Sequence, residues 1–266
     1  MDTFLFAPTS VDEYLLPDDV DDAWGVRFVI PESLYEEVVL TAPDGDKIYG
    51  FIVQPDGPTR DSVTVLYCHG NGDNINRYWG RVELLWEMGY RVFIFDYEGY
   101  GRSEGTPSGD ACYADGRTAL EYILGRTDVN PDRIVYYGWS MGSFVATYLA
   151  ADSLAPYRVV LECPPASATA LVKEGTAFDM PGSFLTEFDF DNEKRIAEID
   201  VPVLMLYGRM DEYLPYQRHA LRIIAAAEGK ADFKVEAVPD AGHEDLPERL
   251  GDRYGELLRE FTGGDQ

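Results

Sequence analysis

The strongest chemical signal in the sequence is a serine flanked by glycines two positions away on either side, in Gly138-Trp-Ser-Met-Gly142. An apolar run at 134–137 precedes the motif and predicts a strand, and the residues after it have helical spacing. On such a strand-to-helix turn the serine takes a strained conformation that exposes its hydroxyl, and the glycines leave room for the neighbouring strand and helix. We therefore expect Ser140 to be a nucleophile, the alternative being a tight structural turn.

A serine hydroxyl needs a base that accepts its proton and a carboxylate that orients this base. The sequence offers three histidines. His69 directly follows a predicted strand and precedes Gly70, so we interpret it as a residue that shapes its loop. His219 falls inside a predicted helix and is expected at the surface or in packing. His243 lies in a glycine-bearing loop after the last predicted strand and is the expected base.

The orienting carboxylate should lie on a loop at the same end of the sheet, between the serine and the histidine in sequence order. Asp211 fits best, because it follows the predicted strand 203–207 and precedes Pro215, which can begin the next helix. Without that role, Asp211 would be a turn residue and the base would lack a partner. The alternatives that stay open are Glu162, Glu212 and Asp240.

Attack on a carbonyl creates negative charge on oxygen, which preorganised N–H groups must stabilise. The backbone N–H of Met141 follows the expected nucleophile at a helix start, and the N–H of Asn71 belongs to the glycine-rich run 68–74 after a strand. We expect these two groups to form the oxyanion hole. The alternative for the run 68–74 is an ordinary loop that joins a strand to a helix and has no role in catalysis.

The candidate catalytic residues must be positioned by strands and helices, and the hydrophobic pattern of the sequence predicts these elements. From residue 63 onward, short runs rich in β-branched and aromatic residues alternate with stretches of helical length, which predicts a parallel sheet covered on both faces. An opening hairpin is expected from the runs 38–41 and 47–53 around a turn at 43–46. The predicted strands are 63–68, 92–95, 134–137, 159–161, 203–207 and 233–238. The predicted helices are 75–88, 110–124, 141–151, 216–227 and 247–261.

The chain is expected to form one domain at 36–266, preceded by a lead-in segment at 1–35 that lies over the fold. The lead-in is acidic and rich in turn residues. One long interruption, at about 164–200, separates two predicted strands and carries two prolines at its start. We expect this segment to be a cap inserted over a pocket.

The composition narrows the possible partners and compartments. With 22 basic and 48 acidic side chains the net charge is -26, which repels phosphate backbones and anionic membranes, so we expect a small-molecule partner and no nucleic acid. Adaptation to concentrated salt and an ordinary acidic surface both explain this charge.

The cysteine pattern and the absence of targeting signals bear on the compartment. The three cysteines show no disulfide or zinc spacing and are expected to be buried. The sequence has neither a secretory signal nor an apolar run of membrane-spanning length, which predicts a cytoplasmic protein without a membrane anchor.

Taken together, the motifs resemble the α/β-hydrolase superfamily over about residues 36–262. They are His69-Gly-Asn-Gly72, Asp96-Tyr-Glu-Gly-Tyr-Gly-Arg-Ser103, Gly138-Trp-Ser-Met-Gly142, Asp211 and Gly242-His243. The His-Gly-Asn loop and the short cap are similar to the BEM46-like α/β-hydrolase domain proteins, which often carry an N-terminal membrane anchor. The resemblance implies a mostly parallel eight-stranded sheet flanked by helices, with an antiparallel second strand. It also implies a triad of Ser140, Asp211 and His243 that uses no metal or cofactor.

The expected activity is that of a serine hydrolase which cleaves carboxylic esters or thioesters of small to medium acyl groups through an acyl-enzyme. A peptidase or amidase that uses the same triad is one alternative. A non-catalytic binding protein on the hydrolase scaffold is the other, because fold alone does not determine function. A dehalogenase is disfavoured, since that chemistry places an aspartate where this chain has Ser140.

Overall fold

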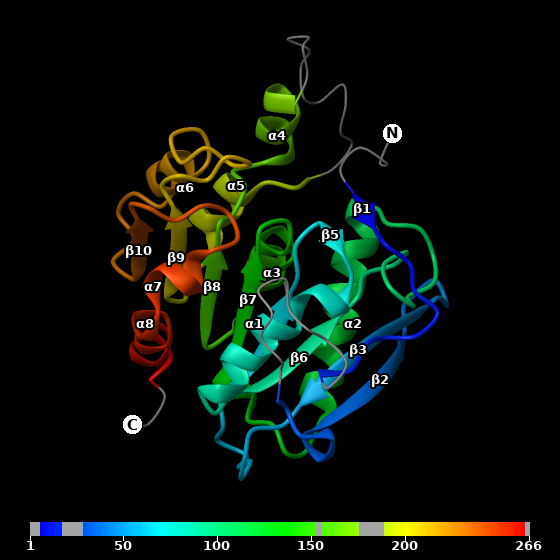
Figure 1. Ribbon diagram of the computed structural model, residues 1–266. Helices are drawn as coiled ribbons and strands as arrows, with labels where there is room; N and C mark the ends of the chain where they lie inside the picture. The colour runs from blue at the N-terminus through cyan, green and yellow to red at the C-terminus, as the bar shows by residue number, and fades with distance from the viewer. Residues whose placement is uncertain (1–5, 18–28, 153–155, 176–188, 264–266) are drawn as a thin grey trace. The chain divides into compact units, whose positions relative to one another are not determined.

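The computed structural model describes residues 6–17, 29–152, 156–175 and 189–263. The chain divides into two compact units, and the boundary between Val135 and Tyr136 falls inside strand β7 (Ile134–Trp139). The first unit carries the strands before β7, and the second carries the strands after it (Figure 1).

The sheet of the first unit is mixed. Its spatial order is β4-β6-β3-β2, with β4 parallel to β6 and with β3 antiparallel to both β6 and β2. The predicted opening hairpin is confirmed, and its register runs from Tyr35 opposite Val53 to Thr41 opposite Lys47. The antiparallel second strand is therefore also confirmed. The bounds are β2 (Tyr35–Thr41), β3 (Lys47–Val53), β4 (Thr64–Cys68) and β6 (Arg91–Phe95).

Two long helices accompany these strands, close to their predicted positions. In α1 (Ile75–Glu87) the N-terminal amide of Asn76 is capped by the Asn74 side chain, and the apolar face buries Trp79 completely. In α2 (Gly109–Gly125) Ser108 caps the first turn. Because each capping side chain satisfies an amide that the helix itself leaves unbonded, these residues explain where the helices begin. Two short 3-10 helices, η3 (Glu32–Leu34) and η4 (Pro131–Arg133), complete the unit.

The described part of the lead-in segment packs onto two loops of the first unit. Strand β1 (Ala7–Pro8) pairs in parallel with β5 (Gly72–Asp73), in the loop that follows β4. The Tyr14 hydroxyl donates a 2.6 Å hydrogen bond to Asp96 Oδ2, in the loop that follows β6. These contacts hold the described lead-in residues against the loops after β4 and β6.

Two of the buried carboxyls of the first unit, Glu98 and Asp115, have strongly shifted pKa values. Burial, and then the charges of Asp44 and Asp46, raise the pKa of Glu98 to about 7. Burial also raises the pKa of Asp115 to about 8, an effect that the hydrogen bond from the Glu98 backbone opposes and the Glu98 charge reinforces. Burial and the neighbouring acidic groups therefore oppose the ionisation of both carboxyls near neutral pH.

The second unit has the strand order β10-β9-β8-β7, and β9 pairs in parallel with both β8 and β10. The carboxyl ends of β8, β9 and β10 therefore lie at one edge, where the following loops begin. Strand β10 ends this order and buries only Val238, so the expectation that it is a fully buried strand is wrong. The bounds are β8 (Arg158–Glu162), β9 (Val203–Gly208) and β10 (Phe233–Val238).

The helices of the second unit differ from the predictions in two places. The predicted helix 216–227 is shorter, because residues 216–219 form turns before α6 (Ala220–Ala226) begins. The predicted helix 247–261 is two helices, because Gly251 has φ 53° and ψ -133° and ends α7 (Leu246–Leu250) before α8 (Asp252–Thr262). Helix α3 (Gly142–Asp152) follows β7 as predicted. The expected cap at 164–200 contains α4 (Ala168–Gly175) and α5 (Asn192–Glu198), and its residues 176–188 lie outside the described part.

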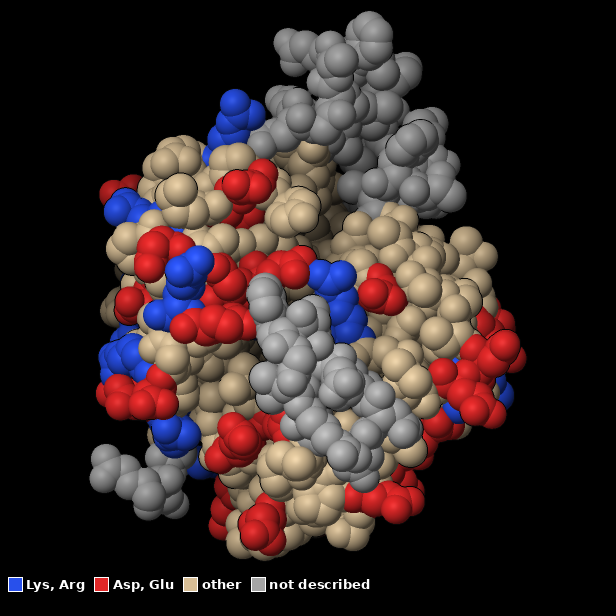
Figure 2. Space-filling view, viewed as in Figure 1, with Lys and Arg blue, Asp and Glu red and all other residues tan. Residues whose placement is uncertain are grey.

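Many of the acidic side chains lie on the surface of the protein. Figure 2 shows Asp and Glu side chains in several separate areas of the visible face, with Lys and Arg side chains between them. Among the helices in the described ranges, none combines the length and the apolar character that a membrane crossing requires.

The break between α7 and α8 gives a test of backbone conformation. Alanine at Gly251 meets no atom within 4 Å, so only the backbone conformation opposes it, and we expect Gly251→Ala to lower the free energy of unfolding by about 1 to 3 kcal/mol. Gly125→Ala, at the end of α2, also enters open space but without a positive φ, and should leave stability unchanged or slightly raised. Urea unfolding at fixed salt measures both, and equal effects would contradict this explanation of the break.

Candidate active site

The structure brings Ser140, His243 and Asp211 together in one chain of hydrogen bonds. His243 Nε2 lies 3.0 Å from Ser140 Oγ, and His243 Nδ1 lies 2.7 Å from Asp211 Oδ2. Both distances are within the range that proton transfer between a nucleophile, a base and an orienting acid requires. The three residues come from the loops that follow β7, β10 and β9, all within the second unit.

The backbone around Ser140 has the geometry expected of the glycine-flanked motif. Ser140 has φ 52°, which is rare for a residue with a side chain, and its N–H donates to Glu162 O at 2.8 Å. A Cβ on Gly138 would lie 2.4 Å from Ser143 Cα, so any larger residue there would push α3 away from β7. The strained conformation is therefore held by the close contact of strand and helix.

Asp211 is fixed on both of its oxygens. Its Oδ1 accepts the backbone N–H groups of Tyr213 at 3.0 Å and Leu214 at 2.7 Å, and its Oδ2 faces His243. Its side chain is fully buried. A buried carboxylate held in this way keeps the imidazole in one orientation, because neither group can rotate without losing hydrogen bonds.

Two aromatic side chains lie beside His243. The rings of Trp139 and Tyr213 each have their centroids 5.5 Å from that of the imidazole, and Trp139 Nε1 donates to His243 O at 3.4 Å. Tyr213 and Met210 are 74% and 64% exposed, and the Met210 N–H donates to Ala241 O at 2.9 Å in the loop that carries His243. The sequence analysis missed these residues, although Trp139 and Tyr213 directly adjoin Ser140 and the Asp211 loop in the sequence.

The alternative acids occupy other environments. Glu162 is completely buried, and its carboxylate accepts hydrogen bonds from the hydroxyls of Tyr254, at 3.0 Å, and of Tyr137. Glu212 and Asp240 are exposed. Asp211 is thus the carboxylate that bonds the His243 imidazole.

The other two histidines lie outside the triad as expected, although His219 precedes α6 and does not lie inside a helix as predicted. His69 is buried in the first unit, where its Nδ1 lies 2.8 Å from Gly70 O and its Nε2 lies 3.2 Å from Asp96 Oδ1. His219 is buried in the second unit, and its Nδ1 accepts the Ala166 N–H at 3.1 Å. Both residues fix loops.

A buried amide anchors the helix that follows Ser140. Asn192 Nδ2 donates to Ser143 Oγ at 2.8 Å and to Pro165 O at 2.7 Å, while its Oδ1 accepts the Thr147 hydroxyl at 2.7 Å. The Ser143 hydroxyl in turn donates to Ser140 O at 2.6 Å. Asn192 therefore joins the expected cap segment to the first turns of α3, a role that no sequence pattern predicted.

Cys163 lies closer to the site than the sequence indicated. The three cysteines are free and buried, as predicted. Cys163, however, has φ 45° and presents its sulfur within 4.8 Å of a carboxylate oxygen of Asp211 and a ring nitrogen of His243. These atoms could together hold a soft metal ion, although the Asp211 to His243 hydrogen bond already pairs two of them.

The two expected oxyanion donors fall in different units. Met141 directly precedes α3 in the second unit. Asn71 belongs to the first unit, where its Oδ1 accepts the Tyr100 hydroxyl at 2.8 Å and the Ala7 N–H at 3.0 Å. Its loop is therefore well anchored, and the joint role of the two N–H groups stays a prediction.

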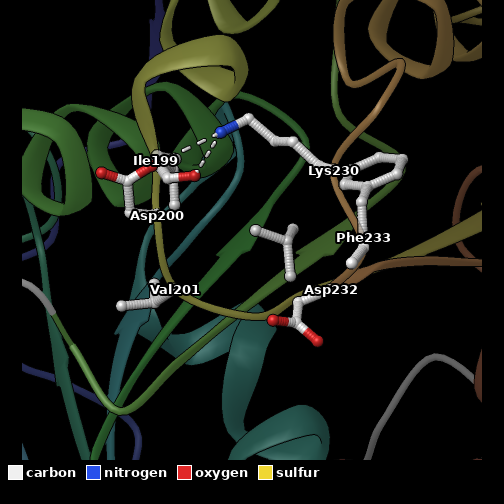
Figure 3. A pocket seen from close by; sticks show the side chains of 8 residues that line it. Ile199, Asp200, Val201, Lys230, Asp232 and Phe233 are labelled. Atoms are coloured by element: carbon white, nitrogen blue, oxygen red, sulfur yellow. Dashed lines mark hydrogen bonds and ion pairs between the residues drawn. The ribbon is translucent and has the colours of Figure 1, made fainter.

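A separate pocket lies at the opposite end of the second unit's strands (Figure 3). Lys230 reaches across it to donate to Ile199 O at 2.6 Å and lies 3.9 Å from Asp200 Oδ1. Strand β9 runs from Val203, which lines this pocket, toward the Asp211 loop, a distance of about 17 Å for its length. The pocket is therefore not part of the Ser140 site.

Comparison with known proteins identifies the class. The model of the alpha/beta hydrolase fold family matches residues 63–195. The uncharacterized protein YfhR of Escherichia coli strain K12 is 30% identical, over 97% of this chain and 87% of its own length. The chain therefore belongs to the α/β-hydrolase family.

Two further similarities agree with this membership. Protein bem46 of Schizosaccharomyces pombe is 29% identical over 85% of this chain and 76% of its own, so the resemblance to the BEM46-like proteins is confirmed. The crystal structure of the Pyrococcus furiosus esterase Pf2001 is similar with a TM-score of 0.74 and 20% identity, covering 97% of both chains. The predicted α/β-hydrolase fold, with a mostly parallel sheet flanked by helices, is confirmed, and the antiparallel pairs of β3 make the sheet mixed.

The contact between β7 and α3 can be tested by two matched substitutions. Gly138→Ala should destabilise the protein by about 1 to 3 kcal/mol or more, because its Cβ collides with backbone atoms that cannot move aside. Gly242→Ala is the control beside His243, since its Cβ would meet only Asp245 Oδ1 at 3.4 Å, and should change stability by about 0.5 kcal/mol or less. Denaturant unfolding compares the two, and a tolerated alanine at position 138 would disprove the steric account.

Proposed function

We propose that this protein is a serine hydrolase that cleaves carboxylic esters or thioesters of small to medium acyl groups through an acyl-enzyme. The observation that carries the proposal is the chain of hydrogen bonds from Ser140 Oγ through the His243 imidazole to the buried Asp211 carboxylate. Membership of the α/β-hydrolase family and the similarity to an esterase structure support it.

In the first half of the reaction, Ser140 Oγ attacks the carbonyl carbon while His243 Nε2 takes the hydroxyl proton. The tetrahedral intermediate collapses, the bond to the leaving group breaks, and His243 returns the proton to the leaving oxygen or sulfur. Water then attacks the acyl-serine, with His243 again as the base, which releases the acid and restores Ser140. Asp211 stabilises the imidazolium that forms in both halves.

The oxyanion of each intermediate would be bound by the backbone N–H groups of Met141 and Asn71. The Met141 N–H stands at the start of α3, where the helix dipole favours negative charge. Each such donor contributes about 2.7 to 4 kcal/mol to lowering the barrier. No metal or cofactor is needed for this chemistry.

The surroundings of His243 favour a neutral substrate. The rings of Trp139 and Tyr213 beside His243 give the site an apolar side that suits an acyl or alkyl chain. The net charge of -26 disfavours approach of polyanionic substrates. We therefore propose a neutral small-molecule ester as the partner.

Replacing the nucleophile tests the proposal. Ser140→Ala should lower turnover of p-nitrophenyl esters by a factor of about 10⁴ to 10⁶, because His243 and Asp211 then have no hydroxyl to activate. A series of acyl lengths, followed by the initial burst and the steady-state rate, would also size the acyl pocket. Unchanged turnover in the folded variant would refute the nucleophile, and no ester hydrolysis by the folded wild type would favour amide substrates or a binding role.

The orienting acid can be tested separately. Asp211→Asn should lower kcat by a factor of about 10⁴, because an amide in place of the carboxylate stabilises the wrong tautomer of the His243 imidazole. Glu162→Gln is the matched control, since its carboxylate bonds Tyr254 and Tyr137, and it should keep kcat within about tenfold. If Glu162→Gln abolished turnover while Asp211→Asn left kcat nearly unchanged, the orienting acid would be Glu162.

A further inference from the structure

The carbonyl group of Ser140 accepts two hydrogen bonds from the first turn of α3. The backbone N–H of Ser143 donates to it at 3.0 Å, and the Ser143 hydroxyl donates to it at 2.6 Å. Ser143 is completely buried, so solvent has little access to its hydroxyl. The direction of the Ser140 carbonyl is therefore fixed by one residue of the helix.

The same peptide group carries the Met141 N–H, which is one of the two expected oxyanion donors. A trans peptide is planar, and its C=O and N–H bonds point in opposite directions, so the direction of the carbonyl sets that of the N–H. Ser140 has φ 52°, a conformation that persists where surrounding contacts hold it. The two hydrogen bonds to Ser140 O are such contacts. They act on a donor whose value depends on its aim at the oxyanion.

Asn192 determines where the Ser143 hydroxyl donates. A serine hydroxyl has one hydrogen to donate, and Asn192 Nδ2 occupies Ser143 Oγ as an acceptor at 2.8 Å, which leaves that hydrogen for Ser140 O. The amide is itself fixed, because its second hydrogen bonds Pro165 O at 2.7 Å and its Oδ1 accepts the Thr147 hydroxyl at 2.7 Å. In the opposite orientation the amide oxygen would face Pro165 O, which cannot donate.

The base of the expected cap segment holds Asn192 in place. The Asn192 N–H donates to Ala166 O at 2.9 Å, and the Ala168 N–H donates to Phe190 O at 2.7 Å, so the two ends of the segment are bonded to each other. The Phe190 ring stacks on that of Phe144 in α3, with centroids 4.7 Å apart. Asn192 is completely buried in this contact between cap and helix.

We propose that Ser143 and Asn192 are positioning residues that aim the Met141 N–H at the oxyanion by fixing the Ser140 carbonyl. This proposal rests on the proposed function. Both halves of the reaction pass through an oxyanion, whereas Ser140 Oγ is the attacking atom in the first half alone. Loss of the aim therefore slows both acylation and deacylation, while displacement of the nucleophile slows acylation.

The test is Ser143→Ala in the full chain, followed by stopped-flow hydrolysis of a p-nitrophenyl ester. The rate of the initial burst and the steady-state kcat should each fall at least about tenfold, because a donor held less firmly stabilises each oxyanion less. KM should stay within about threefold, since the two steps slow together.

Ser108→Ala is the matched control for stability. It makes the same substitution in the first unit and removes the hydrogen bond that caps α2, from the Ala111 N–H at 3.0 Å. Both variants should lower Tm by about 2 to 4 °C, but Ser108→Ala should keep both rates within about threefold of the wild type. Equal losses of rate in the two variants would overturn the positioning role in favour of a general effect of stability.

A second substitution tests the step through Asn192. Asn192→Asp keeps the shape of the side chain and the acceptor for Thr147, but a carboxylate has no hydrogen for Ser143 Oγ and draws the Ser143 hydroxyl away from Ser140 O. It should slow both phases as Ser143→Ala does. The double variant should lie within about twofold of the slower single variant, because both changes break one chain of hydrogen bonds.

The kinetic pattern separates the possible outcomes. Unchanged rates in Ser143→Ala, a slower burst with an unchanged deacylation rate, or additive losses in the double variant would each overturn the positioning role while leaving the proposed function intact. A folded wild type that hydrolyses no ester would overturn the proposed function and this proposal with it.

Discussion

The candidate site depends on the parallel pairing of β8, β9 and β10. Parallel strands end at the same edge of a sheet, and the register places Glu162 opposite Leu206 and Val238 opposite Gly208. The loops that carry Asp211 and His243 therefore start side by side, although 32 residues separate the two side chains. The Ser140 N–H bond to Glu162 O adds the serine turn to the same edge.

Close contacts between backbone segments hold the three loops at this edge in fixed positions. Gly138 lets β7 touch α3, and a Cβ on Gly208 would lie 2.1 Å from Gly242 O, so the Asp211 and His243 loops also pack backbone to backbone. The strain at Ser140 persists because these contacts and the buried Asn192 network leave the turn no alternative position. Packing that tight converts a sequence motif into an arrangement accurate enough for proton transfer.

The sequence predicted the elements with strong local signals and missed those that depend on tertiary contacts. Strand-to-helix alternation, the positions of the two long helices and the glycine-flanked serine all have local causes, and the structure has them close to where they were expected. The break at Gly251 could not be recognised, because glycine alone does not reveal a positive φ. The positions of Cys163, Asn192 and Tyr213 near the site follow from chain folding, which no local pattern encodes. The two oxyanion donors and the ends of the cap stay predictions.

The central claim is that Ser140 is activated by His243 in the folded protein. Its most direct test is reaction with a fluorophosphonate probe, followed by mass spectrometry of the digested protein. We expect one adduct, on the peptide containing Ser140, that forms in the folded protein and disappears after denaturation or in the His243→Ala variant. Labelling of a different serine, or no labelling of the folded protein, would contradict it.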